Sequence, residues 1–159
     1  MKILVSMCII VAVLTGCLTA QVENTKHALD AAAAANSKRD FRKSMAIYDN
    51  LIEKGQPEGM VGKGMLYWVG AFGLVEHKKA CDLFEQAAEM AHGPAQHLLA
   101  DCFFSGKGRP NDYGQSKKWY EIAIMNGEVK ASCALGNQYR YGLGVDKDLE
   151  LTIQLCRFA

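Results

Sequence analysis

Serine is the first residue type to test for chemistry, because a serine followed three residues later by lysine can form the reactive pair of an acyl-enzyme. The chain has 159 residues, and none of its serines has a lysine at that spacing. Ser6, Ser37, Ser44, Ser105, Ser116 and Ser132 are followed there by Ile9, Asp40, Ile47, Gly108, Trp119 and Leu135. The acyl-enzyme motif is therefore absent.

The other reactive residue types also lack a pattern. His27, His77, His92 and His97 include no pair four residues apart and no adjoining pair of cysteines, as a zinc site would require. The glycines around residues 59–64 and 106–108 match neither the dinucleotide fingerprint nor a phosphate loop. The carboxylates of residues 82–89 have the spacing of a solvated helix face. We expect no catalytic residue, no metal and no cofactor.

Composition excludes one class of partner. The chain is 50% apolar and carries 18 basic against 17 acidic residues, which indicates one ordered globular domain. Binding to DNA or RNA needs a strongly basic face, so we expect no nucleic-acid partner.

The N-terminus predicts export. Lys2 is followed by an uncharged run from Ile3 to Leu14, which is too short for a spanning helix and typical of a secretory signal. Leu14-Thr15-Gly16-Cys17 resembles the bacterial lipoprotein signal, in which the cysteine is lipidated and becomes the mature N-terminus. An aspartate directly after the lipidated cysteine would imply retention at the inner membrane, but position 18 is leucine. The resemblance therefore implies an outer-membrane lipoprotein that faces the periplasm. The alternative is a plain secretory signal with an incidental cysteine.

The rest of the chain repeats with a step of 36 residues and no gaps. Small, aromatic and glycine positions recur in register. They are Gly59, Ala95 and Ala131; Gly64, Ala100 and Gly136; Tyr67, Phe103 and Tyr139; and Gly70, Gly106 and Gly142. Within one period the apolar residues have helical spacing, so each period predicts two antiparallel helices.

The ends of these helices also have recognisable signals. Asp40, Asp112 and Asp148 stand where the second helix of a period would need an N-cap. Pro57 and Pro94 suit the first turn of the first helix. Paired glycines near 106 and 142 would end the first helix and turn the chain.

These residues resemble the Sel-one-like repeat (SLR), a relative of the tetratricopeptide repeat. The run from Ala131 to Val145, followed by Asp148, carries the resemblance most fully, and Phe72 replaces the second turn glycine of the first copy. The resemblance implies an all-α fold, a right-handed α-solenoid of stacked antiparallel helix pairs. The expected segments are a signal peptide at 1–16, a lipidated N-terminus and linker at 17–22, a divergent first helix pair at 23–55, and repeats at 56–91, 92–127 and 128–159, the last one incomplete.

The resemblance also implies function. Bacterial members serve as scaffolds or adaptors, and related repeats bind a protein or peptide on the concave face that the first helices form. The positions there that face away from the apolar stripe are Val61, Met65, Trp68, His97, Asp101, Phe104, Cys133, Asn137 and Arg140. The alternative for Trp68 and Phe104 is packing on neighbouring helices. The rival function is a cell-wall or β-lactamase-like hydrolase, because cysteine-rich secreted members have been described as such.

Four cysteines remain beside Cys17 in the exported chain, and an even number suits disulfides. Cys81 and Cys102 are about equidistant from the turn near His92, and Cys133 and Cys156 from the turn near Val145. Residues equidistant from a short turn lie at one level of two antiparallel helices, so the sequence predicts these two bridges. The alternative is four buried thiols.

The last period stops early, and a solenoid needs a polar end. Ile153, Leu155 and Phe158 therefore predict a surface for self-association. Truncation of a longer native chain explains the same observation equally well.

Overall fold

A computed structural model describes the backbone of residues 2–157 and the side chains of residues 19–157. The side chain of Cys17 and the whole of Phe158 lie outside the described residues. The chain divides into two compact units, residues 1–47 and 48–159, and each is described here by itself. In the described part no helix is long and apolar enough to cross a membrane.

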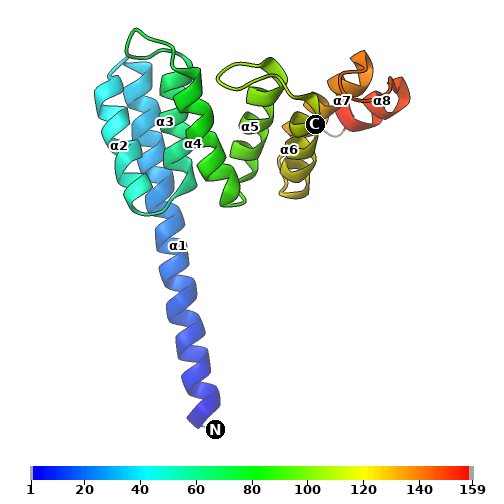
Figure 1. The fold of residues 1–159 in the computed structure, drawn as a ribbon. Helices are drawn as coiled ribbons and strands as arrows, with labels where there is room; N and C mark the ends of the chain where they lie inside the picture. Colours follow the sequence, from blue (N-terminus) through cyan, green and yellow to red (C-terminus); the bar gives the residue numbers. More distant parts are fainter. Residues whose placement is uncertain (1, 158–159) are drawn as a thin grey trace. The chain divides into compact units, whose positions relative to one another are not determined.

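The first unit contains α1 (Lys2–Ser37) and the beginning of α2 (Phe41–Glu53) (Figure 1). The chain turns between the two helices at Arg39, whose φ is 58°. Asp40 caps α2, since its carboxylate accepts a hydrogen bond of 3.2 Å from the backbone N–H of Lys43. The alanine-rich part of α1 contributes Ala32 and Ala35 to the buried residues.

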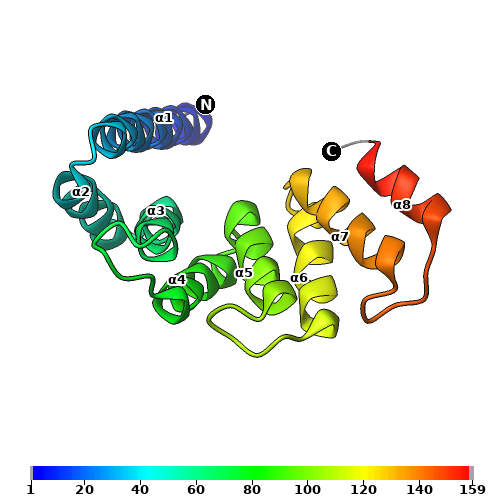
Figure 2. The same cartoon turned by 90° about the horizontal axis from the view of Figure 1, so that it is seen from above.

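The second unit is an α-solenoid of stacked helix pairs. The end of α2 is followed by six further helices: α3 (Pro57–Trp68), α4 (His77–Glu89), α5 (Gly93–Ser105), α6 (Tyr113–Met125), α7 (Lys130–Tyr141) and α8 (Leu149–Cys156). Figure 2 shows α3 to α8 following one another along the unit. From α3 onward each helix packs on the next one in the chain, and α3 also contacts α5. The second helices begin 36 residues apart, at 77, 113 and 149, as the sequence repeat predicts.

The predicted caps and turns are present. The carboxylates of Asp112 and Asp148 accept hydrogen bonds from the backbone N–H groups of Gln115 and Leu151, at 2.9 and 2.8 Å. The first helices α5 and α7 end at glycines with positive φ, Gly106 at 69° and Gly142 at 70°. A side chain other than hydrogen is strained in that conformation.

The second turn glycine has a packing role. A Cβ on Gly108 would meet the backbone of His77 and Lys78 at the start of α4. The turn after α5 therefore lies directly on the preceding second helix. In the turn after α3 this position holds Phe72, and the positive φ falls one residue later, on Gly73 at 91°. The first turn is thus irregular, as the missing glycine predicts.

Small residues let the two helices of a pair approach closely. A Cβ on Gly64 would come within 2.6 Å of the Phe84 ring, and one on Gly136 within 3.2 Å of Cys156 Sγ. Phe84 is 1% exposed and Tyr120, one repeat later, is also 1% exposed. Repeated small residues on the first helix therefore accommodate large buried side chains of the second.

Two disulfides join the helices. Cys81 on α4 is bonded to Cys102 on α5, with Cα atoms 6.2 Å apart. Cys133 on α7 is bonded to Cys156 on α8, with Cα atoms 4.2 Å apart. These are the two pairs that lie at one level in the predicted hairpins.

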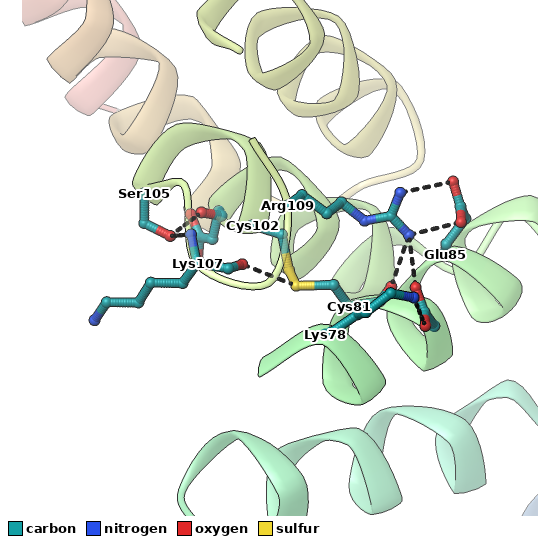
Figure 3. The surroundings of a disulfide bond; sticks show 9 residues. Lys78, Cys81, Glu85, Cys102, Ser105, Lys107 and Arg109 are labelled. Atoms are coloured by element: carbon teal, nitrogen blue, oxygen red, sulfur yellow. Dashed lines mark hydrogen bonds and ion pairs between the residues drawn. A yellow bond between two sulfur atoms is a disulfide. The ribbon is translucent and has the colours of Figure 1, made fainter. Parts of the chain in front are cut away.

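The junction between α4 and α5 is reinforced by charge. The guanidinium of Arg109, in the turn after α5, reaches back to α4 and donates to the carboxylate of Glu85 at 2.6 and 3.3 Å. It also donates to the backbone oxygen of Cys81 and lies 3.5 Å from Asp82. Figure 3 shows this guanidinium beside the bridge between Cys81 and Cys102.

Candidate partner-binding site

One position of the first helices faces solvent in all three repeats. It holds Met65 on α3, Asp101 on α5 and Asn137 on α7, spaced 36 residues apart. Met65 is 38% exposed and Asn137 is also exposed, whereas Asp101 as a residue is partly exposed, with 42% of its side chain open to solvent. We call these three residues the exposed row. An apolar, an acidic and an amide side chain therefore occupy equivalent places on consecutive repeats.

Asp101 is the best-held member of the exposed row. Its Oδ1 accepts a hydrogen bond of 2.5 Å from the hydroxyl of Tyr120 on α6. Its Oδ2 lies 3.8 Å from Nε2 of His97, one turn earlier on α5. The His97 and Tyr120 rings are 5.8 Å apart. Burial and the negative charge of Asp101 raise the pKa of Tyr120 well above its usual range, so the hydroxyl keeps its proton and remains a donor.

Trp68 and Phe104 occupy a second repeat position and pack on the neighbouring helix. The Trp68 ring lies 4.5 Å from the ring of His77, the first residue of α4. The Phe104 ring lies 5.7 Å from that of Tyr113, the first residue of α6. These contacts are 36 residues apart, so an aromatic pair at the same two positions closes each of the first two helix hairpins. Both rings have the contacts that a packing role requires, and both remain partly exposed.

The third repeat lacks that aromatic pair. Arg140 takes the position of Phe104 and is exposed, with its guanidinium 5.3 Å from the centre of the Tyr141 ring. Leu149 takes the position of Tyr113 and is 64% exposed. Arg140 is thus a charged group available on the surface next to the exposed row.

A third repeat position changes its chemistry from copy to copy. Val61 packs against the core cluster that contains Phe84. The residue 36 positions later, His97, lies beside the Tyr120 ring on the second helix. The residue 36 positions after that, Cys133, forms the disulfide with Cys156 on the second helix. Cys133 therefore belongs to the core connection of its repeat and is not available to a partner.

The structure brings His97 and Asp101 together, and it adds Tyr120, a residue of the buried core. Tyr120 aligns with the buried Phe84 and with the disulfide-bonded Cys156. Neither of these residues has a hydroxyl, so the repeat pattern does not predict the hydrogen bond from Tyr120 to Asp101. A second addition is His92. Its Nδ1 accepts a hydrogen bond of 3.3 Å from the backbone N–H of Ala95 and so caps α5.

The described side chains offer no metal site. No group of three or more His, Cys, Asp and Glu residues is arranged there to hold an ion. The Asp101 carboxylate is already engaged by one hydroxyl and faces one imidazole. This arrangement is suited to accepting further hydrogen bonds from a bound chain.

Comparison with known proteins agrees with this architecture. Residues 57–92, 93–128 and 129–159 each match the family described as Sel1 repeat. Among solved structures, a Sel1 repeat protein from Oxalobacter formigenes superposes with a TM-score of 0.77 at 22% identity, over 84% of this chain and 55% of that one. The protective antigen c5321 of uropathogenic Escherichia coli, which displays an SLR fold, gives 0.66 at 29% identity, over 74% of this chain and 25% of that one.

Among curated proteins, the ERAD-associated E3 ubiquitin-protein ligase component HRD3A of Arabidopsis thaliana is 28% identical over 135 residues. That alignment covers 76% of this chain and 20% of the plant protein, so the chain spans about a fifth of its relative's length. The repeat matches cover most of the chain. The chain therefore belongs to the Sel1 repeat family.

Proposed function

We propose that this protein is a bacterial envelope lipoprotein that binds a protein or peptide along the first helices of its repeats. The observation that carries the proposal is the exposed row. Met65, Asp101 and Asn137 occupy one repeat position that points to solvent, and only Asp101 among them also bonds to a buried side chain, the Tyr120 hydroxyl. A surface position that recurs in every repeat is the part of a solenoid that can be devoted to binding.

The chemistry of the row favours an extended polypeptide as partner. Asp101 offers hydrogen-bond acceptors to a backbone N–H or a basic side chain, and Asn137 offers both a donor and an acceptor. Met65 offers an adaptable apolar contact. Arg140 and His97 flank these side chains, while the partly exposed rings of Trp68 and Phe104 add apolar area.

The relatives are consistent with an adaptor. The plant relative is named as a component of a ubiquitin ligase, and 76% of this chain aligns with it. An adaptor needs no catalytic residue, and we propose none for this chain.

The test replaces the two members of the exposed row that bond to no core residue. Met65→Ala combined with Asn137→Ala should reduce retention of the native partner from envelope extract at least about tenfold, the effect of losing one or two central contacts. A matched variant on the second helices, Glu89→Ala with Lys118→Ala, should retain the partner. Equal loss in both variants, or no loss in the first, would contradict the proposal.

The lipid anchor is a separate part of the proposal. It is supported by Leu14-Thr15-Gly16-Cys17 at the end of an apolar run, and it places the repeats at the periplasmic side of the outer membrane. Several acyl chains on one cysteine would anchor the protein stably. Labelling with palmitate in a bacterial host should mark the wild-type chain and not Cys17→Ser. Equal labelling of both would remove Cys17 as the attachment site.

Self-association through α8 is the remaining part. Of the residues expected to associate, Ile153 is 68% exposed, whereas Leu155 is partly buried against the core cluster that contains Tyr120. Ile153 and Leu149, which is 64% exposed and stands one turn earlier, form an apolar stripe. Two copies could bury this stripe against each other. Light scattering should then show a mass above that of one chain, which Ile153→Asp lowers to the monomer. A monomer at every concentration of the wild-type chain would rule this pairing out.

A further inference from the structure

The turn between α3 and α4 exposes an unusual amount of apolar surface. Val69, Leu74 and Val75 are 60%, 75% and 56% exposed, and Phe72 among them is 48% exposed. We call residues 69–75 the apolar loop. Four large apolar side chains within seven residues form a patch, in contrast to the single exposed apolar residues that are common on protein surfaces.

The fold does not require this apolar character. In the second repeat the equivalents of Val69, Leu74 and Val75 are polar or turn residues, namely Ser105, Pro110 and Asn111. In the third repeat they are Tyr141, Asp146 and Lys147. The three turns connect equivalent helices in the same 36-residue register, so the other two serve as internal controls.

Backbone hydrogen bonds hold the apolar loop in place. The N–H of Ala71 donates to the Leu66 oxygen at 3.0 Å, and the N–H of Glu76 donates to the Tyr67 oxygen at 3.0 Å. At the tip, a Cβ on Gly73 would meet nothing within 4 Å. The loop is therefore a fixed projection and not a groove.

Lysines follow the projection directly. Lys78 and Lys79, in the first turn of α4, have side chains 81% and 60% exposed, and Lys78 forms an ion pair of 3.0 Å with Asp82 on the same helix. Lys79 pairs with Glu76, which raises its pKa, so it stays charged. Lys107, in the turn after α5, is a further exposed lysine. It lies near Lys78 and Lys79, because its backbone oxygen is 3.2 Å from Sγ of Cys81 on α4. At the surface of a bilayer the apolar acyl chains lie beneath the anionic headgroups. Apolar side chains at the tip of a loop, followed by lysines, are complementary to these two layers.

We propose that the apolar loop inserts into the surface of a phospholipid bilayer and gives the protein a second membrane contact. The inference rests on the proposed envelope location. A projecting apolar tip favours a bilayer over a protein partner, because a bilayer accepts a projection without a preformed pocket. Val69, Leu74 and Val75 would enter the acyl boundary while Lys78 and Lys79 remain among the headgroups.

Tryptophan fluorescence in brominated vesicles tests the insertion. The full chain is reconstituted into vesicles of phosphatidylethanolamine and phosphatidylglycerol with bromine on the acyl chains. Reconstitution keeps the chain at the bilayer whether an acyl group or the apolar leader holds it, so the test does not depend on lipidation. Leu74→Trp adds a third fluorescent tryptophan to Trp68 and Trp119. The emission of those two is measured in the wild-type chain and subtracted. Pro110→Trp and Asp146→Trp are the matched controls in the other turns.

Bromine should reduce the added emission of Leu74→Trp about twofold or more, as expected for a ring at the acyl boundary. It should leave the two controls unchanged. Equal emission of Leu74→Trp in brominated and ordinary vesicles would overturn the insertion, and so would equal quenching at all three turns. Helical circular dichroism must match the parent chain in each variant, and Val75→Trp replaces Leu74→Trp if that variant is misfolded. Failure of palmitate labelling would refute the anchor alone and would leave this result unaffected.

Discussion

Cys81 and Cys102 form a covalent link between two successive repeats, since the first lies on the second helix of one repeat and the other on the first helix of the next. One repeat later the equivalent residues are Lys117 and Gln138, and that junction is not covalent. There Gln138 is fully buried and donates to the backbone oxygen of Tyr113 at 3.0 Å. The second disulfide instead joins the two helices of the last repeat. One disulfide therefore joins two neighbouring repeats, and the other joins the two helices within one repeat.

Removing either disulfide should destabilise the second unit. The bridged residues are 21 and 23 positions apart, and closing loops of this length restricts the unfolded chain by about 3 kcal/mol each. Cys81→Ala with Cys102→Ala, and Cys133→Ala with Cys156→Ala, should each lower the free energy of unfolding in urea by about that amount. Mass spectrometry of the unreduced wild-type protein should find no free thiol among these four residues. Four free thiols would refute both bridges.

Arg109 should stabilise the junction between α4 and α5. Its side chain is 18% exposed and pairs with Glu85 at 2.6 Å, but the carboxylate partner is 40% exposed and solvent weakens the pair. Arg109→Met should therefore cost about 1 kcal/mol. Lys117→Met is the control, because Lys117 pairs with Glu121 at 3.7 Å on a more exposed surface, and it should cost a few tenths of a kcal/mol. Chemical denaturation of both variants would show no difference if the guanidinium had no structural role.

Gly108 should tolerate no side chain. Its φ is +76°, and a Cβ would also meet the backbone of His77. Gly108→Ala should lower the free energy of unfolding by about 3 kcal/mol or more, because strain and a backbone clash add. Gly127 has a φ of +84° with nothing within 4 Å, so Gly127→Ala should cost only about 1 kcal/mol, from the strain alone. Thermal melts that rank the two variants in the reverse order would contradict the close contact.

Stability should decrease in acid through His92. Burial lowers the pKa of His92 below its ordinary value of 6.5, while Glu58 and Glu128 oppose that shift. The unfolded chain therefore binds the proton more readily than the native protein, and the contribution of His92 is complete above pH 6.5. It is lost as the pH falls from 6.5 toward the lower native pKa, since a protonated Nδ1 cannot accept the hydrogen bond from Ala95.

His92→Asn isolates this effect, because asparagine caps helices and does not titrate. The variant should match the wild type at pH 8 and lose less stability than the wild type at pH 5.5. Parallel decreases in the two proteins, measured by urea denaturation at each pH, would assign the acid sensitivity to other groups.

The sequence predicts much of this fold because the repeat has no gaps. Once the register is known, the helix starts at 77, 113 and 149 follow from capping aspartates and apolar spacing. The two bridged pairs follow from hairpin geometry, which needs only the distance of each cysteine from its turn.

Contacts between the side chains of different helices are harder to predict. Phe104 looked as suited to binding as Asp101, because both face away from the apolar stripe of α5. Only the three-dimensional packing shows Phe104 against Tyr113 and Asp101 held by Tyr120. The His92 cap escaped the sequence analysis because histidine is not among the usual N-cap residues, and Pro94 already accounted for the start of the helix.

The central claim is that the exposed row meets a polypeptide partner. Its most direct test places a photo-crosslinking amino acid at Asn137, at Asp101 and, as control, at Lys118 on α6, and irradiates intact cells. The account predicts one shared adduct of defined mass from positions 101 and 137 and none from 118. The same adducts from all three positions, or an adduct from 118 alone, would contradict it.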